Sequence, residues 1–246
     1  MKIVVIGATS AIAEHCCRLW AAEGPVDFTL MGRDTTKLEK IATDLRVRGP
    51  KATVTLAKAE FLDPIAIRAF AESTMTQRPV DIVLIAHGWM PNQEACEQDL
   101  AMVKESLEVN AVSPALFAEA FATHFAKVGR GTIAIIGSVA GDRGRKANYT
   151  YGSCKSLLSR YAEGMAHRFA GTGVKIVLIK PGPTDTPMAA EHKAKGRRLA
   201  SVEQVARETV AGIRRGRAVV YTPAIWLPIM LIVRHIPRFI FNKLSI

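Results

Sequence analysis

Near its N-terminus the chain reads Ile3-Val4-Val5-Ile6-Gly7-Ala8-Thr9-Ser10-Ala11-Ile12-Ala13. The four β-branched residues predict a buried strand, Gly7 predicts a tight turn, and the small residues after it predict a helix. The backbone N–H groups of such a turn can point at a pyrophosphate, and the positive end of the helix dipole also favours its binding. Because Ala11 and Ala13 stand where a glycine-rich fingerprint has glycines, a plain strand-to-helix turn is the alternative.

Further along the chain, apolar runs alternate with helical segments. We expect strands at 26–31, 52–56, 80–86, 131–136, 174–179 and 218–222, and helices at 11–22, 37–48, 64–76, 100–125, 151–170 and 202–215. The strands are continuously apolar, which is typical of a sheet covered on both faces. The pattern predicts an α/β fold: a doubly wound parallel sheet of about seven strands with helices on both faces. We expect one domain over residues 1–222 and a C-terminal appendage over residues 223–246.

Composition excludes several classes of protein. Of the 246 residues, 49% are hydrophobic and 22% charged, which suffices for a large core and rules out disorder as the main state. The four cysteines include no CxxC pair, which favours the reducing cytoplasm and argues against a structural zinc site; we expect no metal. The net charge is +11, and eleven basic against three acidic residues lie within 190–246. This basic region is strongly apolar, so we expect an anionic surface or ligand and no nucleic acid.

The strongest chemical signal is the sequence Tyr151-Gly152-Ser153-Cys154-Lys155. A spacing of four places Tyr151 and Lys155 on one face of a helix. A phenol with its ordinary pKa of about 10 is a poor base at neutral pH, and a neighbouring ammonium lowers that pKa. A solvated helix face is the ordinary alternative, but Ser138 after the fifth strand and Asn110 in the fourth helix favour a catalytic group.

Together these motifs resemble the short-chain dehydrogenase/reductase superfamily over residues 1–222. Their order is the glycine turn, Ile85-Ala86-His87-Gly88, Asn110, Gly137-Ser138, Tyr151 with Lys155, and Pro181-Gly182-Pro183-Thr184-Asp185-Thr186. The resemblance implies a Rossmann-type fold and an NAD(P)(H)-dependent enzyme that moves hydride between nicotinamide and a carbonyl or secondary alcohol. It implies that Ser138 holds the substrate carbonyl, Tyr151 transfers the proton, Lys155 lowers the pKa of Tyr151 and binds the ribose, and Asn110 positions a relay water. A non-catalytic nucleotide-binding sensor or scaffold on the same fold is the alternative function.

The resemblance also implies a set of cofactor contacts. They are Gly7, Thr9, Ser10, Ala11, Ile12, Arg33, Glu60, Phe61, Ala86, His87, Gly88, Lys155, Pro181, Gly182, Thr184 and Thr186. An acidic side chain at the end of the second strand would accept from a ribose 2′-hydroxyl, but Gly32 and Arg33 occupy that place, which favours NADP(H) over NAD(H). Asp34 is either a helix cap or a ribose acceptor. His87 either faces the cofactor or finishes the fourth strand, and we favour the strand.

Residues 223–246 form an apolar and basic tail. Its apolar run, 223–233, is too short to span a bilayer, and we expect Pro228 to interrupt it further. Trp226 and the basic residues Arg234, Arg238 and Lys243 are typical of a segment at a membrane surface; packing on its own core or on a subunit partner is the alternative. The basic segment 188–199 is expected beside the substrate, either as a phosphate receptor or as a solvated face.

The tail, the Gly-Ala-Thr-Ser turn and His87-Gly88 resemble those of reductases that act on polyprenyl-phosphate-linked keto sugars, the decaprenylphosphoryl-2-keto-ribose reductase group. This resemblance implies a small-molecule or lipid-linked carbonyl substrate, a homodimer or homotetramer, and a cytoplasmic enzyme at the inner face of the cytoplasmic membrane.

Overall fold

The computed structural model describes residues 1–58, 60–190, 194, 196 and 198–244, with the backbone alone at Gln77. Within these residues seven strands form one parallel sheet in the order β3-β2-β1-β4-β5-β6-β7. The strands are β1 (Lys2–Ile6), β2 (Val26–Gly32), β3 (Ala52–Lys58), β4 (Ile82–Ile85), β5 (Arg130–Ile136), β6 (Gly173–Pro181) and β7 (Val219–Thr222). The strand order reverses between β1 and β4, and such a switch point opens a ligand crevice at the carboxyl ends of the strands.

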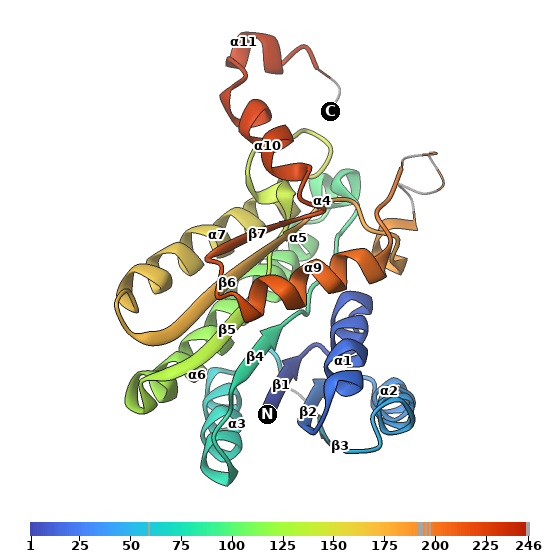
Figure 1. Ribbon diagram of the computed structural model, residues 1–246. Coiled ribbons are helices and arrows are strands. Elements are labelled where there is room, and N and C mark those ends of the chain that lie inside the picture. The colour runs from blue at the N-terminus through green and yellow to red at the C-terminus, as the bar shows by residue number, and fades with distance from the viewer. Residues whose placement is uncertain (59, 191–193, 195, 197, 245–246) are drawn as a thin grey trace.

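Helices cover both faces of this sheet, so the predicted fold class is confirmed (Figure 1). One face is covered by α1 (Ala11–Glu23), α2 (Thr35–Arg48) and α9 (Val202–Arg214), and the other by α3 (Pro64–Gln77), α6 (Ser113–Val128) and α7 (Tyr149–Arg168). Each face has its own hydrophobic core, which explains why the central strands are apolar on both sides.

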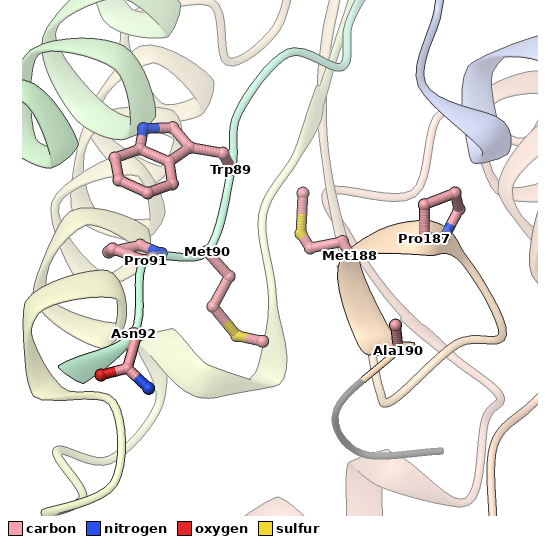
Figure 2. A pocket seen from close by; sticks show the side chains of 7 residues that line it. All are labelled: Trp89, Met90, Pro91, Asn92, Pro187, Met188 and Ala190. Atoms are coloured by element: carbon pink, nitrogen blue, oxygen red, sulfur yellow. The ribbon is translucent and has the colours of Figure 1, made fainter. Parts of the chain in front are cut away.

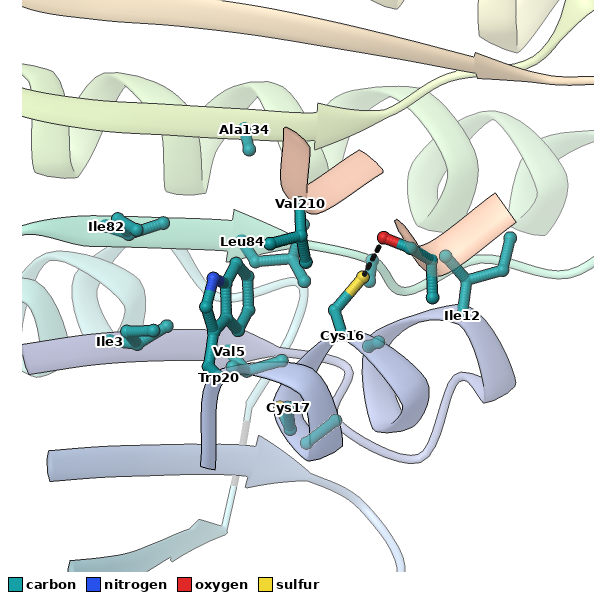
Figure 3. Close-up of a cluster of buried hydrophobic side chains, with 14 of the residues drawn as sticks. Ile3, Val5, Ile12, Cys16, Cys17, Trp20, Ile82, Leu84, Ala134 and Val210 are labelled. Atoms are coloured by element: carbon teal, nitrogen blue, oxygen red, sulfur yellow. Dashed lines mark hydrogen bonds between the residues drawn. The ribbon is translucent and has the colours of Figure 1, made fainter. Parts of the chain in front are cut away.

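The core under α1 shows how the N-terminal turn is supported (Figure 3). Trp20 is 1% exposed and belongs to the same buried cluster as Val5, Leu84 and Val210. Cys16 lies on the same helix with its Sγ 3.9 Å from the Ala206 carbonyl oxygen of α9. Cys16, Cys17, Cys96 and Cys154 are all free thiols and all buried.

The prediction of one continuous helix over residues 100–125 is wrong. The segment divides into α5 (Leu100–Leu107), a π-helical turn η1 (Glu108–Val112) and α6. Pro114 explains the break, because it lacks the N–H that would donate to the Asn110 carbonyl in an α-helix. The Ser113 N–H instead donates to the Glu108 carbonyl, five residues back. A short helix α4 (Gln93–Gln98) was not expected at all.

The tail forms two helices beyond the last strand, α10 (Trp226–His235) and α11 (Arg238–Phe241), which stand at the top of Figure 1. The expectation that Pro228 interrupts this segment is wrong. Pro228 lies in the first turn of α10, where a missing N–H costs no helical hydrogen bond. Across the described part of the chain, no helix is both long and apolar enough to cross a membrane.

Candidate active site

The glycine turn lies at the carboxyl end of β1 and leads into the N-terminus of α1. Gly7 has a φ of +80°, and a Cβ there would lie 2.6 Å from the backbone nitrogen of His87, so only glycine fits. The N–H groups of Gly7 and Ala8 donate to the Met31 carbonyl at 2.9 and 3.0 Å and fix the turn. Ala13 is fully buried in the core, so its methyl group is not in the crevice. The first-turn N–H groups of α1, which include those of Ala11 and Ile12, have no intrahelical acceptor and are available to a phosphate.

Tyr151 and Ser138 meet at the ends of β5 and α7. Ser138 opens a 3-10 turn, η2 (Val139–Gly141), and its Oγ accepts from the Ala140 N–H at 3.1 Å, which leaves its hydroxyl proton free to donate. Burial raises the pKa of Tyr151 to about 12, and a hydrogen bond from Ser138 opposes that rise. At neutral pH the phenol is therefore a protonated group and a hydrogen-bond donor.

Lys155 carries an ammonium into the same region. Its side chain is 3% exposed, its Nζ donates to the Ile136 carbonyl at 3.1 Å, and it lies 5.6 Å from the centre of the Tyr151 ring. Burial lowers the pKa of Lys155 to about 8. An ammonium has three donors, and the structure describes one acceptor for them, so donors are left to bind a hydroxyl group.

Asn110 is held beside Lys155 by the π-helical turn. Its Oδ1 accepts from the Trp89 N–H at 2.8 Å, and its Nδ2 donates to Ser106 Oγ at 3.1 Å. A Cβ on Gly88 would lie 2.7 Å from Asn110 Oδ1 and 3.6 Å from Lys155 Nζ, so both polar groups converge on this glycine. The structure thus brings together all four residues predicted as catalytic.

His87 packs as part of the protein interior. Its Nε2 lies 2.9 Å from Ser113 Oγ, and its ring lies 4.7 Å from that of Phe61. Burial, with the nearby charges of Lys155 and Arg33, lowers its pKa to about 3, so the imidazole is neutral. Its Nδ1 is buried and has no hydrogen-bond partner within the described residues. Ala86 continues the β4 pairing through its N–H to the Ile6 carbonyl at 2.8 Å, and Glu60 is exposed.

The two residues expected to select the cofactor have different environments. Arg33 is exposed at the end of β2. Asp34 is the N-cap of α2, where its Oδ1 accepts from the Lys37 N–H at 3.0 Å. The Asp34 carboxylate is therefore already engaged, in agreement with the helix-cap alternative.

The segment after β6 forms the opposite wall. Thr184 is buried, and its hydroxyl donates to the Gly182 carbonyl at 2.9 Å. Thr186 precedes a 3-10 turn, η3 (Pro187–Ala189). Gly182 is covered by the tail, because a Cβ there would clash with the Trp226 indole nitrogen. Of the basic segment expected near the substrate, His192, Lys193, Lys195 and Arg197 lie outside the described residues, as do positions 245–246 of the tail.

A pocket of about 370 Å³ opens between the segment after Gly88 and η3 (Figure 2). Met90 and Met188 extend into it from opposite sides. Its lining residues are Trp89, Met90, Pro91, Asn92, Pro187, Met188 and Ala190. Because Trp89 follows Gly88 and Pro187 follows Thr186, this pocket adjoins the predicted cofactor walls.

Several residues that support the site were not predicted. Gln93 is buried, and its Oε1 accepts from the Thr150 N–H at 2.9 Å, which fixes the first turn of α7. Asp142 forms a buried ion pair with Lys180. One signal in the sequence points to the second role: Lys180 is a charged residue at the end of an apolar strand.

A parallel sheet with a glycine turn before a helix N-terminus, and with a phenol, a hydroxyl and an ammonium beside its switch point, has the arrangement of a nucleotide-dependent oxidoreductase. Residues 1–197 match the model of the short chain dehydrogenase family, and the chain belongs to that family. The protein is an NAD(P)-dependent oxidoreductase of this family.

A relative supports this membership, and two solved structures share the fold. It is 31% identical to an uncharacterised oxidoreductase of Streptomyces coelicolor over 100% of this chain and 96% of that one. Among solved structures, a short-chain dehydrogenase from Sphingobium yanoikuyae in complex with NADPH has a TM-score of 0.83 at 20% identity and covers 100% of this chain and 97% of that one. A bulky-bulky ketone specific alcohol dehydrogenase from Comamonas testosteroni has a TM-score of 0.81 at 19% identity, with 99% and 94% covered.

Proposed function

We propose that the protein uses NADPH to reduce a ketone to a secondary alcohol, and that the ketone belongs to a lipid- or polyprenyl-phosphate-linked keto sugar. One observation carries the catalytic part: the Tyr151 phenol, the Ser138 hydroxyl and the Lys155 ammonium converge near Gly88, the residue before the pocket-lining Trp89. The catalytic roles of Tyr151, Ser138, Lys155 and Asn110 are part of this proposal.

Proton transfer is assigned to Tyr151. The substrate carbonyl oxygen accepts hydrogen bonds from Ser138 and Tyr151, and the phenol donates its proton as negative charge develops on that oxygen. The Lys155 ammonium stabilises the phenolate left behind. The cofactor supplies the hydride from its nicotinamide.

The residues present fit that cofactor. The first turn of α1 receives the pyrophosphate, while the unused donors of Lys155 bind the nicotinamide ribose. Pro181, Gly182 and Thr186 frame the nicotinamide from the opposite wall.

The preference for NADP(H) rests on Arg33. Its guanidinium is exposed at the end of β2, where a 2′-phosphate would lie, while Asp34 is occupied by the cap of α2. A guanidinium binds a phosphate through paired hydrogen bonds, and the acidic group that would repel the phosphate is turned to the helix.

The lipid-linked substrate rests on the pocket and the tail. Met90 and Met188 give the pocket flexible apolar walls, and the tail exposes apolar side chains among basic ones. We propose that residues 223–246, an appendage to the domain of residues 1–222, contact the inner face of the cytoplasmic membrane. We also propose a homodimer or homotetramer. The non-catalytic sensor would be favoured by an incomplete catalytic set, and all four side chains are present.

Replacing Tyr151 with Phe tests the catalytic proposal. Tyr151→Phe keeps the ring and removes the transferable proton, so turnover should fall by roughly 10²–10⁴-fold while NADPH affinity changes little. Tyr149→Phe is the matched control, because Tyr149 is exposed two residues earlier on the same helix, and it should behave as the wild type.

The assay follows NADPH oxidation with bacterial membrane lipid extract and with a panel of small soluble ketones. Near-wild-type turnover of Tyr151→Phe would contradict the catalytic assignment. Turnover with small ketones and none with the lipid extract would contradict the lipid-linked substrate and leave the catalytic assignment standing.

A further inference from the structure

Two consecutive residues after the Ser138 turn, Asp142 and Arg143, connect it to other parts of the molecule. Asp142 has a side chain only 2% exposed and forms an ion pair with Lys180, whose side chain is 7% exposed. The Tyr221 hydroxyl donates to the second carboxylate oxygen at 2.7 Å. Lys180 and Tyr221 are register partners in the β6–β7 pair, so Asp142 fixes the turn to the carboxyl ends of both strands.

Arg143 connects the same turn to the tail. Its guanidinium donates to the Arg234 carbonyl at 2.8 Å and to the Ile236 carbonyl at 3.0 Å, both at the end of α10. It also lies 4.3 Å from the centre of the Phe241 ring in α11. One side chain therefore holds both helices of the tail.

The other end of α10 contacts the opposite wall of the site. Trp226 begins this helix and packs directly on Gly182, where no side chain would fit. The tail thus touches the Ser138 turn through Arg143 and the Gly182 wall through Trp226.

The turn between Arg143 and Ser138 is short and tightly bonded. The Gly141 N–H donates to the Ser138 carbonyl, and the Asp142 N–H to the Val139 carbonyl, both at 3.1 Å. Gly141 packs on the α7 backbone, because a Cβ there would lie 2.6 Å from the Lys155 carbonyl carbon. The turn is therefore fixed to α7 through Gly141 and to the tail through Arg143, and only four residues separate Arg143 from Ser138.

We propose that Arg143 is a positioning residue, through which the seating of the C-terminal tail sets the position of the Ser138 hydroxyl. This inference rests on the proposed role of Ser138 with Tyr151. The part of the tail's effect that Arg143 carries passes through the Ser138 turn, and it is separate from the contact of Trp226 with the Gly182 wall.

Full-length Arg143→Ala, assayed with NADPH and a soluble ketone, tests the inference. We expect kcat to fall about 10-fold to 100-fold, because a displacement of about 1 Å can cost two orders of magnitude. The KM and the NADPH affinity should stay within about threefold. Arg143→Lys should not restore kcat, since an ammonium cannot bridge two carbonyls as a guanidinium does. Arg217→Ala, at an exposed arginine between α9 and β7, is the control and should match the wild type.

A second measurement separates positioning from folding. A hydrogen bond from Ser138 opposes the raised pKa of Tyr151, so losing its alignment should raise that pKa further and move the acid-side limb of the alcohol-oxidation profile, on which activity rises with pH, to higher pH. A wild-type kcat and pH profile in Arg143→Ala would overturn the inference. So would a loss of kcat accompanied by an equal loss of NADPH binding and a lower Tm. If Tyr151→Phe is inactive while Arg143→Ala is unaffected, only this inference fails; if Tyr151→Phe stays active, the proposed function fails.

Discussion

Lys155 is the residue at which function and stability oppose each other most directly. The fold buries its ammonium with one described acceptor, and this lowers its pKa from 10.5 to about 8. Folding therefore disfavours the charged form, and the cost is fully present below pH 8. The cost shrinks as the pH rises toward 10.5, where the unfolded chain also loses the proton.

Lys155→Met should therefore stabilise the protein while abolishing turnover. The relieved cost is about 3 kcal/mol at about 1.4 kcal/mol per pKa unit, and the lost hydrogen bond to Ile136 offsets about 1 kcal/mol. Urea unfolding at pH 7 should show a gain in the free energy of unfolding of about 2 kcal/mol, and the gain should disappear near pH 10.5. A less stable variant at pH 7 would show that the ammonium contributes to the fold.

Arg33→Ala should weaken NADPH binding by one to two orders of magnitude and NADH binding little. The reason is the loss of a charge-assisted hydrogen bond to the 2′-phosphate, worth about 1.5–3 kcal/mol. Fluorescence titration with both cofactors measures the effect. Asp34→Asn is the companion variant, because asparagine retains the cap of α2 and should leave both affinities unchanged. Tighter binding of NADH than NADPH by the wild type would contradict the preference.

For single residues, the sequence allowed the catalytic side chains to be predicted but not the residues that contact and support them. Asn110, Ser138, Tyr151 and Lys155 were predicted from spacing and resemblance, and the structure brings them together. The partners of Asp142, Lys180 and Tyr221, lie 38 and 79 residues further along the chain. Only the pairing of β6 with β7 brings both side chains close to the Asp142 carboxylate. Local patterns contain no information about such distant contacts.

Among the elements, the fourth helix and the tail differ most from expectation. Apolar periodicity continues through Asn110, so it predicts one helix where Pro114 produces a π-helical turn. The tail was expected to break at Pro228, yet its position in a first turn allows the helix to form. In both segments, the position of a proline relative to the first residue of a helix decides whether the helix is interrupted. The sequence alone does not define where that first residue lies.

The exposed face of the tail gives a prediction about membrane contact. Ile232 is 68% exposed and Phe239 71% exposed, close to Arg234 and Arg238. Each apolar side chain contributes up to about 1.5–3 kcal/mol if fully buried in lipid, and each basic residue about 1 kcal/mol near an anionic surface. Replacing Ile232 and Phe239 with Gln should weaken binding to phosphatidylglycerol vesicles at least tenfold in a sedimentation assay, with turnover of a soluble ketone unchanged.

The control for that assay is Ile65→Gln with Leu100→Gln, two exposed apolar residues on α3 and α5. These changes should leave vesicle binding intact. A wild-type protein that ignores anionic vesicles, while the Ile232 and Phe239 variant loses its oligomeric state, would show that this face is a subunit interface.

In the whole molecule, the predicted class of fold is confirmed, but the sequence did not define the strand order. Continuous apolar strands separated by helices require a parallel sheet with two covered faces, which is what Ile3–Ile6 and Ile82–Ile85 already indicate. Which strands are neighbours depends on how the two cores close around β1. That is a property of packing between Trp20, Val210 and other distant residues, and no single segment shows it.

Because all four cysteines are buried, the rate at which their thiols react measures how often the protein interior opens to solvent. A thiol reagent such as dithionitrobenzoate needs access to sulfur, and burial raises the pKa of Cys154 above its ordinary value, which leaves little reactive thiolate. The native protein should therefore show no fast-reacting sulfur, and colour should develop only as quickly as the interior is transiently exposed.

Because Cys154 adjoins Lys155, saturating NADPH should slow its modification more than that of Cys96. Mass spectrometry of the labelled peptides would distinguish the two sites, and equal protection of both would mean that the crevice opens only when the whole molecule unfolds.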